Sequence, residues 1–252
     1  AVGSLSIYHY GFKKLKQKND YVQTDRDADK STADNKVANK KAVTKKSILD
    51  KPSRAATAFA LAENGWVVTS YHTVKGEKSV TLERVGSGFE SYEADVKFFN
   101  KKLDIAILKI NDKNFKGFGK IPYSFTDGNA VIAQDVFSLG FPKDDIVYTE
   151  GSISSLSGYK MDTLAYQAGI MVNPGNSGAP LFNVQGDIIG VIAGKNASED
   201  GASYAIKGKY LIHMIKHIKP NEADKPIILP SKNLLKGKKA TDQVKMIEPF
   251  VF

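Results

Sequence analysis

The sequence predicts an all-β protein built from two six-stranded antiparallel β-barrels followed by a C-terminal helix. Short apolar runs separated by turn residues fill residues 55–206 and fall into two consecutive sets. Closing each set into a barrel removes the exposed edges that an open sheet would leave. A segment with helical apolar spacing follows the second set.

The first barrel is expected within residues 55–115. Its apolar runs are ATAFAL, WVVTSY, SVTLERV, YEADVKFF and DIAILKI, and the turn signals ENG and GSG lie between them. Runs of this length bounded by Gly and Asn are typical of strands joined as hairpins. We therefore assign this range to one small antiparallel unit.

The second barrel is expected within residues 116–206, in the runs AVIAQDVFSLG, DIVYTEGSIS, LAYQAGIMV, APLFNV, DIIGVIAG and ASYAI. Residues 207–219 contain apolar side chains at 211, 212, 215 and 218, which predicts a helix with one face packed on the second barrel. Pro220 marks its end. Residues 220–252 are expected to form a tail that wraps the core.

Residues 1–54 form a separate basic and polar segment. The first twelve residues are apolar and aromatic and run into KKLKQK, an order that resembles the interfacial end of a membrane span. A span needs about 20 apolar residues, so this stretch is either the remnant of a longer segment, serving as a membrane tether, or a leader that touches no membrane. Residues 19–46 have no core periodicity and predict a tether or a solvated helix.

Charge and composition narrow the function classes. The net charge is +9, but the excess lies mainly in residues 1–54, and residues 55–219 are balanced. No nucleic-acid partner is therefore expected, because such a surface concentrates basic residues where it binds. The chain has no cysteine. His213 and His217 are spaced to share a metal, but without a third ligand we expect neither a metal site nor an organic cofactor.

The most specific motif is NPGNSGAPL at residues 173–181, a glycine-rich turn between two apolar runs. Glycines on both sides let the backbone bend so that the Ser177 hydroxyl stands clear. The N–H groups of Gly175 and Ser177 can then point at one spot, as in an oxyanion hole. The alternative is an ordinary surface turn that contains a serine.

Two upstream residues complete a constellation with Ser177. His72 follows the run WVVTSY, and Asp104 begins the run DIAILKI. A serine is a poor nucleophile until a base takes its proton, and the imidazole needs a carboxylate to hold its tautomer. The three residue types together predict a catalytic triad, with Ser177 as nucleophile, His72 as general base and Asp104 orienting the base.

Over residues 55–215 the sequence resembles the trypsin-like serine peptidases, and specifically the high-temperature-requirement (HtrA/Deg) branch of bacterial envelope proteases. The resemblance is carried by TAFALAENGWVVTSYHTV, DIAILKI and NPGNSGAPLFNVQGDIIGVI. It implies the chymotrypsin-like fold, with His72 and Asp104 on the first barrel and Ser177 on the second. It further implies an oxyanion hole made by the backbone amides of Gly175, Asn176 and Ser177.

The sequence departs from that family in several ways. A peptide-binding PDZ domain has no room after the predicted helix, so oligomeric chaperone behaviour is not expected. Ala56 and Tyr71 stand where glycine and a smaller residue are commoner, and neither prevents a triad. Ile192 occupies the position of a histidine in glutamate-specific relatives, so glutamate specificity is not expected.

The resemblance also indicates which residues contact substrate. Ile170, Met171 and Val172 would floor an apolar specificity pocket, and the opposite wall would come from Ile192, Ala193, Gly194 and Lys195. We expect a small or medium aliphatic residue before the scissile bond, with the extended substrate pairing by strand addition. If the Lys195 ammonium instead turned into the pocket, an acidic residue would be favoured.

The leading hypothesis is a serine endopeptidase that acts through an acyl-enzyme intermediate on extended protein or peptide substrates. We expect it in the bacterial cell envelope, periplasmic or membrane-anchored. The rival hypothesis is a catalytically idle homologue whose cleft and strand edge bind peptides.

Overall fold

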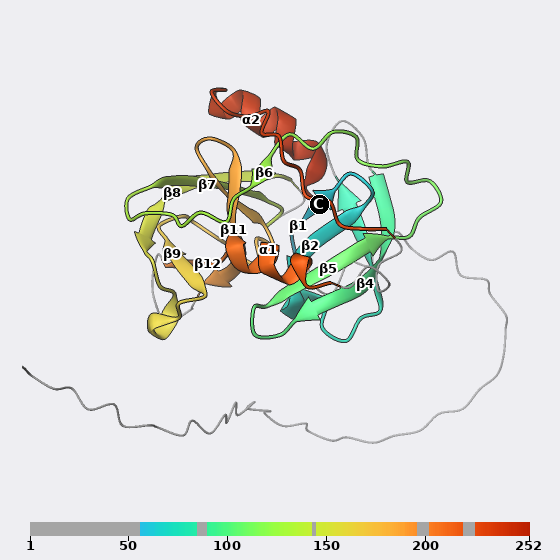
Figure 1. Cartoon of the computed structure of the whole chain (residues 1–252), viewed down its shortest axis with the longest axis horizontal. Coiled ribbons are helices and arrows are strands. Elements are labelled where there is room, and N and C mark those ends of the chain that lie inside the picture. The colour runs from blue at the N-terminus through green and yellow to red at the C-terminus, as the bar shows by residue number, and fades with distance from the viewer. Residues whose placement is uncertain (1–55, 85–89, 143–144, 196–201, 219–224) are drawn as a thin grey trace, which may run out of the picture. The chain divides into compact units, whose positions relative to one another are not determined.

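The computed structural model of the protein describes residues 56–84, 90–142, 145–195, 202–218 and 225–252. Predictions for the basic segment 1–54 lie outside the described residues. The described chain forms two antiparallel β-units with short helices packed against them (Figure 1). No helix in these ranges is long and apolar enough to cross a membrane.

The first unit is a five-stranded antiparallel sheet, in which each of the five predicted apolar runs forms a strand. In spatial order its strands are β1 (Ala58–Ala62), β2 (Trp66–Ser70), β5 (Ile105–Ile110), β4 (Glu90–Asn100) and β3 (Ser79–Arg84). The described strands do not close on themselves, because β1 and β3 lie at opposite edges. The strand count differs from the six expected, and this half is an open half-barrel.

The C-terminal residues cover the free edge of β1. Phe59 pairs with Val251, and Ala58 and Phe252 exchange two backbone hydrogen bonds of 2.8 Å. The tail thus satisfies the unpaired edge groups that closure would otherwise have satisfied.

The second unit is the closed barrel that the sequence predicts. Its seven strands run in the order β10–β7–β8–β9–β12–β11–β6, and a further β10–β11 pairing closes six of them. Each of the six predicted runs contains one strand. The two-residue β6, which joins β11 in parallel, carries no sequence signal. The strands are β6 (Ser124–Phe125), β7 (Asp135–Gly140), β8 (Val147–Ser155), β9 (Ala165–Ala168), β10 (Pro180–Asn183), β11 (Asp187–Lys195) and β12 (Ser203–Lys207).

Helix α1 (Gly208–Lys216) confirms the predicted amphipathic helix. Its buried side chains include Leu211, Ile212 and Ile215, three of the four apolar positions that predicted it. A second helix, α2 (Ala240–Ile247), lies in the segment expected only as a tail. The short 3-10 helices are η1 (Tyr71–Thr73), η2 (Tyr159–Met161) and η4 (Glu248–Phe250).

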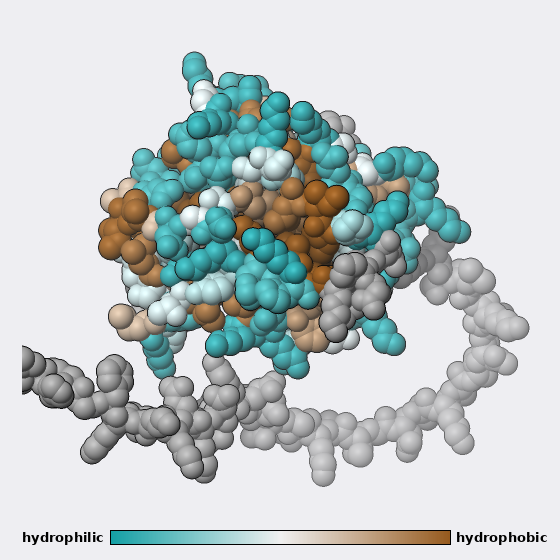
Figure 2. Space-filling model, in the orientation of Figure 1, coloured by the Kyte–Doolittle hydropathy of each residue, from teal (hydrophilic) through white to brown (hydrophobic). Residues whose placement is uncertain are grey.

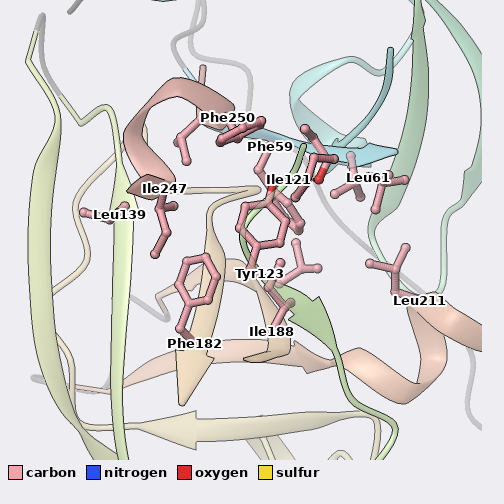
Figure 3. Close-up of a cluster of buried hydrophobic side chains, with 14 of the residues drawn as sticks. Phe59, Leu61, Ile121, Tyr123, Leu139, Phe182, Ile188, Leu211, Ile247 and Phe250 are labelled. Atoms are coloured by element: carbon pink, nitrogen blue, oxygen red, sulfur yellow. Dashed lines mark hydrogen bonds between the residues drawn. The ribbon is translucent and has the colours of Figure 1, made fainter. Parts of the chain in front are cut away.

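The main hydrophobic cluster joins both β-units and the tail. Figure 3 shows Tyr123 between Phe59 of β1 and Phe182, with Leu61 and Ile121 to one side, Ile247 to the other and Phe250 above. All of these residues are at most 8% exposed. Burying a side chain of this size contributes about 1.5 to 3 kcal/mol. The two units are therefore held together by a shared core.

The face of the molecule seen in the space-filling view (Figure 2) is mostly polar. On the face in Figure 2, hydrophilic residues predominate and apolar residues gather near the centre. Met161, Met171 and Ile228 are the most exposed large apolar side chains among the described residues, each more than 70% exposed. Of these, only Met171 belongs to the set predicted to contact substrate.

Candidate active site

Strand register brings His72 and Asp104 together. Strands β2 and β5 pair so that Ser70 lies opposite Ile105. The chain turns into η1 directly after Ser70, and the Tyr71 N–H donates a 2.9 Å hydrogen bond to the Asp104 carbonyl. His72 and Asp104 therefore meet just beyond the paired ends of two adjacent strands.

The Asp104 carboxylate holds His72 at two points. Its Oδ2 lies 2.6 Å from the ring Nδ1 of His72, and its Oδ1 accepts a 2.8 Å hydrogen bond from the backbone N–H of His72. The Asp104 side chain is 25% exposed and that of His72 is 51% exposed. A carboxylate only accepts, so this contact puts the imidazole proton on Nδ1 and makes Nε2 the basic nitrogen.

The turn that presents Asp104 is shaped by its neighbours. Asn100 Oδ1 accepts hydrogen bonds from the N–H groups of Lys102 at 3.0 Å and Leu103 at 3.1 Å. Asp104 itself has a φ of 51°, a left-handed conformation that aspartate tolerates better than most residues. The direction of the Asp104 carboxylate therefore depends on the left-handed backbone conformation of Asp104 as well as on the pairing of β2 and β5.

The serine motif forms two tight turns between β9 and β10, over residues 173–179, and this segment is called the serine turn below. The Asn176 N–H donates to the Asn173 carbonyl at 3.0 Å, and the Ala179 N–H donates to the Asn176 carbonyl at 2.9 Å. The N–H groups of Gly175 and Ser177 donate to no other described residue. Of the three amides that the resemblance assigned to an oxyanion hole, two thus remain available, and that of Asn176 is engaged within the turn.

This turn packs directly on the end of β2. The Ile192 carbonyl accepts both the Gly178 N–H at 2.7 Å and the Ser70 hydroxyl at 3.2 Å. Thr57, just before β1, donates its N–H to the Ser177 carbonyl at 2.9 Å. These bonds tie the backbone beside Ser177 to the strand end that leads to His72.

Gly178 makes this close approach possible. Its φ is 90°, and a Cβ there would lie 2.5 Å from Thr69 Oγ1 and 2.8 Å from Ser70 N. No L side chain fits such a position without displacing the first sheet. The glycine motif indicates a turn at Gly178, but neither this close approach nor the role of Thr57 has a local sequence signal, because both depend on packing between the two units.

The residues predicted to line the specificity pocket separate into two groups. Ile170 and Val172 are 2% and 4% exposed and pack in the cluster inside the second barrel, whereas Met171 between them is 74% exposed. Of the residues predicted to form the opposite wall, Ile192 is buried and Ala193 half-buried. Gly194 and Lys195 continue β11, paired with Tyr204 and Ser203, but the Lys195 side chain lies outside the described residues.

Of the two histidines spaced to share a metal, His213 lies on α1 and His217 is the residue that follows its last turn. Their rings are 4.1 Å apart, and His217 Nδ1 lies 2.7 Å from the His213 carbonyl oxygen. Within the described ranges no group of three His, Cys, Asp or Glu side chains could hold a metal ion.

The fold and the site together define a class of protein. A half-barrel bearing a His–Asp pair, joined to a closed barrel bearing a glycine-bounded serine turn, is the architecture of the chymotrypsin-like double-barrel proteins. The sequence profile of the trypsin-like peptidase domain matches residues 56–191. The chain belongs to the trypsin-like peptidase family.

Its relatives include HtrA-type serine proteases. The chain is 28% identical over 188 residues to the "Serine protease Do-like HtrA" of Lactococcus lactis subsp. lactis, covering 67% of this chain and 44% of that protein. It is 31% identical over 167 residues to "Serine protease HTR4" of Bos taurus, covering 62% of this chain and 33% of that protein. The chain thus spans less than half the length of these relatives.

Solved structures share the fold. The Rv3671c protease of M. tuberculosis, in an inactive form, matches with a TM-score of 0.53 at 24% identity, over 66% of this chain and 86% of that one. The serine endoprotease of Yersinia pestis matches with a TM-score of 0.51 at 22% identity, over 65% of this chain and 62% of that one. At these identities the likeness concerns the fold alone.

Proposed function

We propose that the protein is a serine endopeptidase that hydrolyses peptide bonds with Ser177, His72 and Asp104. The observation that carries the proposal is the 2.6 Å contact between His72 Nδ1 and Asp104 Oδ2, next to the junction where the serine turn packs on β2. Membership of the trypsin-like peptidase family supports it. A peptide-binding module would need no such orientation of the imidazole.

Each group has a defined role in the proposed reaction. His72 Nε2 takes the Ser177 proton as Oγ attacks the scissile carbonyl, and Asp104 stabilises the imidazolium that forms. The N–H groups of Gly175 and Ser177 donate to the oxyanion of the tetrahedral intermediate. His72 then protonates the leaving amine, the acyl-enzyme remains on Ser177, and a water activated by His72 releases it.

The proposed specificity rests on the exposed Met171. Because Ile170 and Val172 are committed to the core, Met171 is the member of the predicted floor whose side chain is free to contact substrate. Burying a Val- or Leu-sized side chain contributes about 1.5 to 3 kcal/mol, so substrates with an aliphatic residue before the cut are favoured. Cleavage-site profiling on a denatured proteome tests this. A preference for Lys or Arg contradicts it, and a loss of Asp or Glu preference in Lys195→Ala supports the alternative pocket.

We also propose that the protein works in the bacterial cell envelope on extended protein segments. A relative from Chlamydia muridarum, 32% identical over 54% of this chain and 27% of its own length, is named "Probable periplasmic serine endoprotease DegP-like". The apolar start of the sequence, followed by basic residues, fits a tether at a membrane surface. Detection of the protein only in the cytoplasmic fraction of its native cells would contradict this location.

A fluorophosphonate probe, which labels only an activated serine, tests the catalytic assignment. We expect wild type to be labelled and Ser177→Ala to be unlabelled but folded. The matched control is Ser91→Ala, which removes an exposed serine on β4 and should leave labelling unchanged. His72→Ala should abolish labelling, whereas His213→Ala, which removes an exposed histidine of α1, should not. A folded wild type that resists labelling would favour the idle peptide-binding homologue.

A further inference from the structure

Thr57 is a buried polar residue beside the proposed oxyanion hole. It lies immediately before β1 and is 0% exposed. Its hydroxyl donates to the Gly175 carbonyl at 2.7 Å and accepts from the Phe141 N–H at 2.9 Å. The direction of the hydroxyl proton is thereby determined, because a carbonyl can only accept and an N–H can only donate.

The backbone of Thr57 holds the other side of the same turn. Its N–H donates to the Ser177 carbonyl at 2.9 Å, and its own carbonyl accepts from Thr69 Oγ1 at 2.8 Å. Thr57 is thus tied to β2 and, at two points, to the serine turn. The two carbonyls that it binds, those of Gly175 and Ser177, belong to the two residues whose N–H groups form the proposed oxyanion hole.

Holding these carbonyls determines how the turn is oriented. A carbonyl and the following N–H share one planar unit, so Thr57 also aligns the Asn176 N–H with Asn173 and the Gly178 N–H with Ile192. The peptide unit between these two consists of the Asn176 carbonyl and the Ser177 N–H, and the Asn176 carbonyl accepts a hydrogen bond from the Ala179 N–H. The remaining donor is the Gly175 N–H. Its direction relative to the Gly175 carbonyl follows from the backbone conformation of Gly175, which has a φ of 103°.

Thr57 also positions the Phe141 backbone, which limits the space next to Gly175. Thr57 holds the Phe141 N–H, and a Cβ at Gly175 would lie 2.6 Å from the Phe141 carbonyl oxygen. The Asn176 side chain does not help to hold the backbone of the turn, because its buried Oδ1 has no hydrogen-bond partner in the described chain. Among the described side chains, the Thr57 hydroxyl is the one that hydrogen-bonds to the Gly175–Ser177 backbone.

We infer that Thr57 is a positioning residue for the oxyanion hole, holding the Gly175 and Ser177 amides in the donor orientation. The inference rests on the proposed function. Its consequence is specific, because loss of the hydroxyl should weaken transition-state stabilisation while leaving the substrate-binding surfaces in place.

The test compares Thr57→Val, which keeps the shape and removes the hydroxyl, with Thr57→Ser, which keeps the hydroxyl. Removing an oxyanion-hole donor costs about 10²- to 10³-fold in kcat; because misorientation is milder, Thr57→Val should lower kcat by about 10- to 100-fold with little change in KM. Affinity for a peptidyl boronate, which forms a tetrahedral adduct on serine, should fall in parallel. Thr57→Ser should restore both.

The matched control is Tyr123→Phe, which removes another fully buried hydroxyl, one that donates at 2.8 Å to the Ala60 carbonyl and not to the serine turn. It should lower the melting temperature but leave kcat unchanged. If Thr57→Val does not fold, Thr57→Ala supplies the same comparison.

The outcomes separate this inference from the proposed function. A wild type unlabelled by fluorophosphonate refutes both. A labelled wild type, together with a folded Thr57→Val or Thr57→Ala that keeps kcat and boronate affinity, refutes the positioning role alone. A loss of kcat that Thr57→Ser does not restore, or that Tyr123→Phe matches, also refutes it.

Discussion

Replacing Gly178 by alanine should separate the serine turn from the first β-unit. The new Cβ would press closest on the Thr57 carbonyl oxygen, and would lie 2.5 Å from Thr69 Oγ1 and 2.8 Å from Ser70 N. All three atoms belong to backbone or to buried side chains that cannot move away independently. The turn carrying Ser177 must therefore shift away from the strand end that carries His72.

The magnitude follows from two contributions. A left-handed backbone conformation costs an L residue about 1 to 2 kcal/mol, and overpacking a dense interior costs about 1 to 3 kcal/mol. We expect Gly178→Ala to lower the free energy of unfolding by about 2 to 5 kcal/mol. A displacement of about 1 Å between reacting groups can cost about 10²-fold in rate, so kcat/KM should fall by at least that factor.

Gly76 provides a matched control. Its φ of 89° equals that of Gly178 within a degree, but a Cβ there would meet nothing within 4 Å. Gly76→Ala should therefore show the conformational cost alone, about 1 to 2 kcal/mol, and near wild-type activity. Urea unfolding and peptide hydrolysis measure both. If Gly178→Ala loses no more stability and activity than Gly76→Ala, the packing argument for the site is refuted.

Three further predictions follow from the same structure. Asp104→Asn should lower kcat by about 10⁴-fold, because the amide permits the wrong imidazole tautomer; retained peptidase activity would assign the orienting role to another carboxylate. Ile247→Ala should lower the free energy of unfolding by about 2 to 5 kcal/mol, because Ile247 is fully buried in the shared core, whereas Ile228→Ala, at a 72% exposed position, should change it by no more than about 0.5 kcal/mol; equal effects in urea unfolding would refute the role of the tail. Burial raises the pKa of Asp187, but hydrogen bonds from Ser124, Asn233 and Asn183 outweigh it and lower the pKa below its ordinary value, so the carboxylate stabilises the fold above the unfolded pKa and loses that contribution as pH falls through the folded pKa. The stability difference between wild type and Asp187→Asn should therefore shrink between about pH 5 and pH 2, and a constant difference would contradict this linkage.

The sequence alone predicted every element with a strong local pattern. Eleven apolar runs bounded by turn residues correspond to eleven of the twelve strands in the described part of the chain, and the apolar spacing of Leu211, Ile212 and Ile215 predicted α1. The residue types of Ser177, His72 and Asp104 predict a triad, because a serine nucleophile requires a base and a carboxylate, and the structure brings His72 and Asp104 into contact. For the strands and the helix the information lies in residue type and short spacing, whereas for the predicted triad it lies in residue type and in the local motifs around each residue.

The tertiary structure decided what depends on packing between distant segments. The tail carries no strong pattern, yet Val251 and Phe252 take the open edge of β1, so the first unit needs no sixth strand. Likewise, Thr57 lies in no distinctive motif, and the contact that makes Gly178 irreplaceable, its close approach to Thr57, Thr69 and Ser70, appears only where β1, β2 and the serine turn meet. The Thr57 hydroxyl donates to a carbonyl 118 positions away in the sequence. This hydrogen bond depends on how the two β-units pack against each other, and no local pattern of residues encodes that packing.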